Sequence, residues 1–150
     1  MKNQKGITLI ALVITIIVLL ILAGITIAML TGENGLLTKS KTAKAENELG
    51  RAKDIINMAA SEGIADYYKT VYVDATSTQT YSAVELQKKV VDKMTASETT
   101  NAMNPVTYKS GSTPTTPTAT TASDITFTIT YNEIEKSGKI TTSGSIEWNS

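Results

Sequence analysis

The sequence contains no cysteine and no histidine, and it has only one phenylalanine and one tryptophan among 150 residues. Without cysteine and histidine, disulfides and nucleophile systems based on Ser-His-Asp or Cys-His are excluded, and a zinc site loses its usual ligands. The acidic residues are scattered and lack the spacing of a calcium loop. No glycine-rich run is followed by a helix pattern, as phosphate binding requires. The sequence therefore predicts no enzyme activity, no cofactor and no metal.

Charge of one sign is also missing, because 14 basic and 14 acidic residues give a formal net charge of zero. No basic face of the kind that binds nucleic acid is indicated. The length suits one modest domain plus an anchor.

Charge is absent altogether from residues 7–30, which contain sixteen Ile, Leu or Val residues. As a helix this run would extend roughly 36 Å, enough to cross a hydrocarbon core of about 30 Å. It exceeds the apolar region of a secretory signal and lacks a clean small-x-small cleavage site, although a plain uncleaved anchor stays open. Two lysines precede the run and three follow it, so the positive-inside rule does not set its orientation.

The residues before this run are Lys5-Gly6-Ile7-Thr8-Leu9-Ile10, which follow a very short basic leader. This segment resembles the processing site of type IV prepilins and type II secretion pseudopilins. The resemblance implies that a membrane-embedded prepilin peptidase cuts between Gly6 and Ile7, and that the new N-terminus is methylated. It covers about residues 1–37 and divides the chain into a leader (1–6), a transmembrane or filament-core helix (7–31) and a pilin-like globular part (32–150).

One position departs from the family pattern. The fifth residue of a mature pilin is usually a glutamate that neutralises a neighbour's N-terminal ammonium in the apolar filament core, where an unpaired charge is costly. That position is Ala11 here. The ammonium would then stay near a polar surface or be solvated by a hydroxyl such as that of Thr8 or Thr15.

The resemblance implies a structural subunit that leaves the cytoplasmic membrane and polymerises with copies of itself in a surface filament. An assembly ATPase and a platform protein would drive this transfer out of the membrane lipid. Two alternatives stay open. The chain could be a minor pilin or a pseudopilin of a secretion or DNA-uptake machine, a role that Ala11 favours. It could also be a membrane-anchored binding domain that never polymerises.

Small residues in and after the apolar run suggest two local features. Gly24 and Ala28 are four residues apart and would allow close helix approach, although chance spacing explains them equally well. Gly32 and Gly35 weaken helix propensity by about 1 kcal/mol each. They predict either a turn that ends the membrane helix or, as in pilins, a hinge within one long helix.

Over residues 36–68 the small and apolar residues recur at steps of four and three, which predicts an amphipathic helix with one narrow buried seam. We expect this seam to pack on a C-terminal sheet, which gives an α+β fold. Its members are Ala45, Leu49, Ala52, Ile56, Ala59 and Gly63.

A capping box, Ser82-Ala-Val-Glu85, predicts a second helix over 82–97. Its buried stripe would consist of Leu86, Val90 and Met94, and Tyr81 would contact Leu86 as a hydrophobic staple. Residues 110–123 are rich in Thr, Ser and Pro and uncharged, which is typical of a solvated loop and also permits O-glycosylation in an exported protein.

Alternating apolar residues predict a C-terminal hairpin over 125–148. A loop at Ser137-Gly138, or over 135–138, would place both apolar sets on one face. Phe127 would then pack near Ile146 or Trp148, with this face covering the long helix. Because two strands alone are marginal, we expect a third strand from 71–73 or 106–109.

Overall fold

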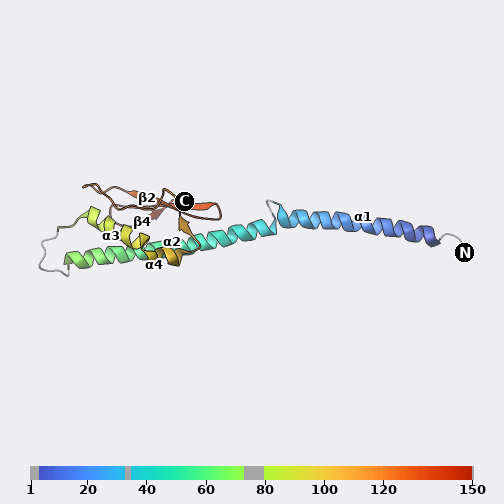
Figure 1. Cartoon of the computed structure of the whole chain (residues 1–150), viewed down its shortest axis with the longest axis horizontal. Helices are drawn as coiled ribbons and strands as arrows, with labels where there is room; N and C mark the ends of the chain where they lie inside the picture. The colour runs from blue at the N-terminus through green and yellow to red at the C-terminus, as the bar shows by residue number, and fades with distance from the viewer. Residues whose placement is uncertain (1–3, 33–34, 73–79, 150) are drawn as a thin grey trace. The chain divides into compact units, whose positions relative to one another are not determined.

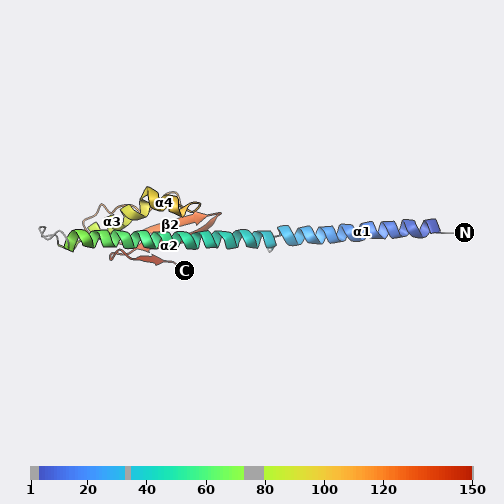
Figure 2. The same cartoon turned by 90° about the horizontal axis from the view of Figure 1, so that it is seen from below.

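A computed structural model of the chain describes residues 4–32, 35–72 and 80–149 (Figures 1 and 2). It divides into two compact units, Met1–Lys44 and Ala45–Ser150, and we call the second unit the head. The elements are α1 (Gln4–Thr31), α2 (Leu36–Tyr72), α3 (Ala83–Thr95), α4 (Ser97–Met103), β1 (Thr107–Tyr108), β2 (Ile125–Tyr131), β3 (Ile134–Ile140) and β4 (Ile146–Trp148).

The narrow seam predicted for α2 is buried along its whole length. Its alanines and glycine let neighbouring elements approach closely: a Cβ on Gly63 would lie 2.7 Å from the Cα of Val90 in α3. The helix continues to Tyr72, so the strand expected over 71–73 is wrong for its first two residues, while Val73 lies outside the described residues. Tertiary packing of the helix overrides the local β propensity of the Val-Tyr pair.

The N-cap bond of the predicted capping box is present, because the Ser82 hydroxyl accepts a hydrogen bond from the Glu85 amide at 3.3 Å, while the Ser82 amide donates to the Tyr67 hydroxyl at 2.6 Å instead of to Glu85. Leu86, Val90 and Met94 are fully buried, as predicted. The half-exposed Tyr81 packs edge-to-face on Tyr67, with ring centroids 6.1 Å apart, and its staple contact with Leu86 stays a prediction. A separate short helix, α4, which the sequence did not indicate, begins two residues after α3 ends.

The chain's one arginine holds α4 against α2. The guanidinium of Arg51 donates hydrogen bonds to the carbonyl oxygens of Ala102 (2.7 Å), Met103 (3.4 Å) and Asn104 (2.6 Å). These carbonyls lie at the C-terminal end of α4, where the last carbonyls of a helix have no partner within it. A cation at this end also interacts favourably with the helix dipole. A distant side chain therefore caps this short helix.

The sheet is an antiparallel meander in the order β1-β2-β3-β4, and the helices of the head lie over one of its faces (Figures 1 and 2). The two-residue loop between β2 and β3 is Asn132-Glu133, so the loop expected at Ser137-Gly138 or over 135–138 is wrong. Both turn residues have positive φ, 48° and 67°, as a type I′ hairpin turn requires, and Asn tolerates this conformation better than most residues. Residues 135–138 lie within β3 instead.

The apolar residues of β2 and β3 still lie on one face of the sheet, as expected, although the loop is at Asn132-Glu133. The reason is that a loop of two residues keeps the alternation of the two strands in phase. Phe127 contacts Trp148 edge-to-face with ring centroids 5.2 Å apart, and both flank Gly138 across the sheet. The Trp148 indole donates a hydrogen bond to the Asn57 side chain of α2 at 3.1 Å. The missing Cβ of Gly138 provides the room: a Cβ there would lie 2.9 Å from the Phe127 ring and 3.1 Å from that of Trp148.

The added strand comes from the predicted 106–109 segment, since β1 pairs with β2 through Thr107–Thr130 and Tyr108–Ile129. Residues 110–123, between β1 and β2, form neither helix nor strand. A turn at their start is held by the Ser112 amide, which donates to the Lys109 carbonyl at 2.9 Å. The fold is therefore the predicted α+β arrangement, with a four-stranded sheet.

Candidate assembly helix and polar face of the head

The surface of α1 is apolar all round. Its described Ile, Leu, Val and Met side chains from Leu9 to Leu30 are 46–74% exposed. The most apolar 18-residue window has a mean hydropathy of 3.2 and no buried residue, so the helix is long and apolar enough to cross a membrane. A helix that is apolar on every side requires an apolar environment outside the chain.

The polar side chains of α1 that the structure describes are satisfied within the helix. The hydroxyls of Thr15, Thr26 and Thr31 donate to the carbonyls of Leu12, Leu22 and Ile27 at 2.8–2.9 Å. Because such bonds need no water, these threonines cost little in a hydrocarbon environment.

The predicted processing residues Gly6 and Ile7, and Ala11 four residues later, all lie within the helical backbone of α1. The side chain of Ile7 is outside the described residues. Gly24 and Ala28 are one turn apart on α1, and a Cβ on Gly24 would meet nothing within 4 Å. Space for a close neighbour is therefore open at Gly24, and helix packing there stays a prediction.

Gly32 and Gly35 lie between α1 and α2, where the regular helix is interrupted. The Gly35 amide donates to the Gly32 carbonyl at 2.6 Å, and a Cβ on Gly35 would lie 2.7 Å from the Leu30 carbonyl oxygen. The Thr38 hydroxyl donates to the same Gly32 carbonyl at 3.2 Å. The junction thus requires glycine for close backbone approach, and its role as a hinge stays a prediction.

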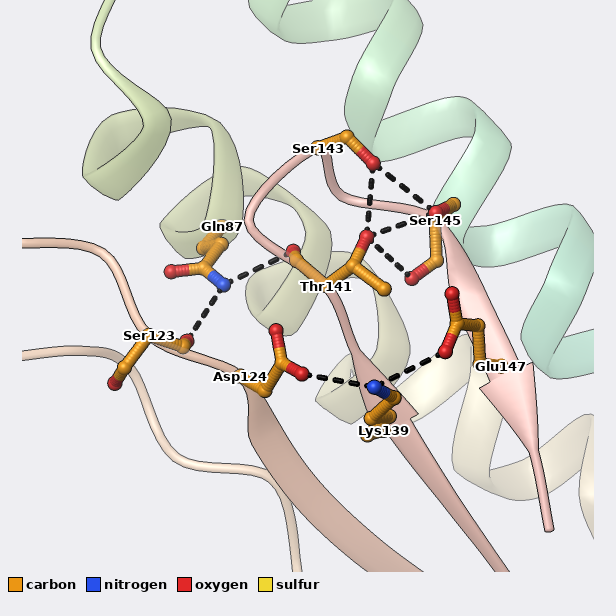
Figure 3. Close-up of polar contacts among 8 residues, drawn as sticks. All are labelled: Gln87, Ser123, Asp124, Lys139, Thr141, Ser143, Ser145 and Glu147. Carbon is orange, nitrogen blue, oxygen red and sulfur yellow. Dashed lines mark hydrogen bonds and ion pairs between the residues drawn. The ribbon is translucent and has the colours of Figure 1, made fainter.

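The head carries a polar cluster at the end of β3, shown in Figure 3. Lys139 lies between two carboxylates, Asp124 at 2.9 Å and Glu147 at 3.0 Å, and its hydrogen bond to Asp124 is the main cause of a raised Lys139 pKa. These pairs join three neighbouring strands or strand ends. They are partly exposed, so their effect on stability is small.

Two further parts of this cluster were not predicted from the sequence. The hydroxyls of Thr141, Ser143 and Ser145 lie 2.8–3.1 Å apart at the β3–β4 turn. The buried Gln87 side chain donates to the carbonyls of Ser123 (2.8 Å) and Thr141 (3.0 Å), and its own oxygen has no partner in the described structure (Figure 3).

These residues brace loops and give no reactive arrangement. Among the residues that the structure describes, the hydrogen bonds of these three hydroxyls are to one another and to backbone, and none is to a general base. In residues 4–32, 35–72 and 80–149 no group of three or more Asp or Glu side chains could hold a metal ion. The burial of Gln87 has one possible signal in the sequence, which is its position next to Leu86 of the predicted buried stripe.

Comparison with protein families matches residues 1–27 to the prokaryotic N-terminal methylation motif. No curated protein and no solved structure gives a significant match. The motif is the prepilin-type cleavage and methylation signal that is typical of type IV pilins and pseudopilins.

Motif and fold agree with each other: an apolar N-terminal helix, an amphipathic helix and a four-stranded antiparallel sheet form a pilin-like α+β protein. Residues 1–27 therefore carry a motif that is typical of type IV pilins and pseudopilins, and they belong to a chain whose fold is pilin-like.

Proposed function

We propose that this chain is cut between Gly6 and Ile7 and then polymerises through α1 as a subunit of a type IV pilus-like surface filament. The observation that carries the proposal is the apolar, exposed surface of α1, most of which lies within the prepilin-type motif of residues 1–27. Before assembly the neighbours of α1 are lipid tails, and in the filament they are the α1 helices of other copies. The two environments have similar polarity, so the transfer is nearly neutral for the helix itself.

The same reasoning defines the partners. A prepilin peptidase removes residues 1–6, and an assembly ATPase with a platform protein supplies the work of drawing the subunit through the head-group layer. The subunit is a single-pass protein of the cytoplasmic membrane before assembly and part of a surface filament afterwards.

Mass spectrometry of sheared surface filaments tests this proposal directly. We expect a mature N-terminus at Ile7, and the same spectrum reports whether Ile7 is methylated with Ala11 in place of glutamate. The variant Gly6→Leu should accumulate uncut in the membrane. The matched control Gly50→Ala changes a helical glycine with open space around it and should be processed normally. A different mature N-terminus would refute the processing step.

Ala11 favours a second candidate function, that of a minor pilin or pseudopilin. A subunit at a filament tip, or one that primes assembly, has fewer neighbours whose ammonium groups need neutralising. Abundance separates the two roles: a major pilin dominates the sheared material, whereas a minor subunit is present at trace level. Finding only uncut, membrane-bound monomers would support the remaining alternative, an anchored binding domain.

A further inference from the structure

Three lysines follow the apolar helix in the same structural unit. Lys39, Lys41 and Lys44 are exposed on the first turns of α2, and we call them the lysine collar. No acidic residue occurs between Gly35 and Ala45. The ion pairs recorded among the described residues all lie in the head, and none includes a collar lysine.

The collar surrounds the helix and does not form a stripe. At about 100° per residue, Lys41 and Lys44 lie about 200° and about 140° around the helix axis from Lys39. Within about 7.5 Å of helix length, positive charge therefore faces opposite sides. A protein partner docking on one face would engage only part of this set, whereas a layer through which the helix passes would engage all of it.

The charge of the chain is divided between its two units. Residues 1–44 carry five lysines and one glutamate, a formal charge of +4, and 45–150 carry nine basic and thirteen acidic residues, a charge of −4. Removal of Lys2 and Lys5 with the leader would leave +2 on the first unit, and the collar supplies all of its remaining basic side chains.

We propose that the lysine collar binds the phosphate groups of anionic phospholipids and so holds the subunit in the membrane until assembly. This inference rests on the proposed membrane stage of the function. Leu36 and Leu37, 74% and 49% exposed, precede the collar and would lie at the boundary between acyl chains and head groups. Lysine stems cover apolar surface there while their ammonium groups reach the phosphates.

Spin-labelled lipids test the proposal on the full-length chain in vesicles of phosphatidylcholine with about 30% phosphatidylglycerol. We expect labelled phosphatidylglycerol to associate with the protein at least about twofold more strongly than labelled phosphatidylcholine. The preference should fall to near one in about 0.5 M NaCl, because salt screens exposed charges. It should also be lost in Lys39→Gln/Lys41→Gln/Lys44→Gln. A matched triple variant of head lysines, Lys69→Gln/Lys88→Gln/Lys89→Gln, should keep it.

Vesicle flotation, measured on the same samples, separates the two proposals. Protein that fails to float refutes the membrane stage and hence the proposed function. Protein that floats but binds both lipids equally overturns the collar inference alone. If that protein instead self-associates in a salt-sensitive way, the collar belongs to the acidic head of a second copy.

Discussion

α1 and α2 have the same secondary structure but opposite surroundings. Leu20 in α1 is 67% exposed, whereas Leu49 in the buried seam of α2 is fully buried. In α2 the buried side chains are mostly small or apolar and form a seam that packs in the head core, whereas in α1 apolar side chains cover every side and are exposed.

The difference shows which part of the molecule is complete. The head buries its apolar seam and caps α3 and α4 with its own groups, so these elements need no partner outside the chain. The sixteen Ile, Leu and Val residues of 7–30 would contribute roughly 5 to 10 kcal/mol on insertion into lipid, and α1 gains none of this within the chain. The free energy that holds α1 in place has to come from lipid or from other copies.

The largest expected effect comes from placing a charge in the middle of α1. Leu20→Asp should weaken insertion by about 3 to 4 kcal/mol, because an aspartate at the centre of a spanning helix is unfavourable where leucine is favourable. We expect a clear loss of vesicle flotation and of filament yield. The melting temperature of the head should not change, since Leu20 is not a member of the head's buried core.

The matched control is Met58→Asp, which adds the same charge at an exposed apolar position of α2. It should leave flotation intact. A parallel loss of flotation in both variants would mean that the two helices do not differ in the way their exposure suggests.

Two glycines of α2 sharpen the comparison within the head. A Cβ on Gly63 would lie 2.7 Å from Val90 Cα and 2.8 Å from the Lys89 carbonyl oxygen, whereas one on Gly50 would meet nothing within 4 Å. Gly63→Ala should destabilise the head by about 1 to 3 kcal/mol, because backbone atoms must separate. Gly50→Ala should stabilise it by about 0.5 to 1 kcal/mol through helix propensity.

Thermal unfolding of the full chain in detergent measures this pair. The expected shifts have opposite signs, and for a domain of about 100 residues each kcal/mol moves the melting temperature by about 4 to 8 °C. Equal shifts would show that α2 and α3 are not in the close contact described above.

Much of this architecture follows from periodicity. The seam of α2, the Ser82 cap and the alternation in β2 depend on side chains within a few residues of each other, so the sequence predicts them. The position of the hairpin turn was not predicted correctly, because Ser137-Gly138 resembles a turn sequence more strongly than Asn132-Glu133 does. The space that Gly138 leaves for Phe127 and Trp148 becomes apparent only once the strands are paired.

The candidate site divides in the same way. Gly6 and Ile7 are readable from a local motif, and the apolar surface of α1 from composition alone. Arg51 and Gln87 are different, because their partners are carbonyl oxygens tens of residues away in sequence. Backbone carbonyls carry no side-chain identity, so no pattern in the sequence indicates such contacts.

The smallest expected effect concerns the ion pairs that join α2 to α3. Lys93 lies 2.5 Å from Glu62 and 2.9 Å from Asp66, and these hydrogen bonds raise the pKa of Lys93, with that to Glu62 the larger cause. The hydrogen bond to Lys93 is also the main cause that lowers the pKa of Asp66. The Asp66 contribution is therefore present above the ordinary Asp pKa of 3.8 and is lost as pH falls through the lowered folded value.

The Lys93 contribution has the opposite sign: it is present below the ordinary Lys pKa of 10.5 and is lost as pH rises through the raised folded value. Lys93→Met should accordingly lower the melting temperature slightly at pH 7, with the difference from the wild type closing in strong acid. Lys88→Met is the control, because Lys88 pairs with Glu85 inside α3 and joins no second element. A Lys93→Met difference that persisted in strong acid would assign the effect to the packing of the lysine's methylene groups. In that case charge would contribute nothing measurable to the contact between the two helices of the head.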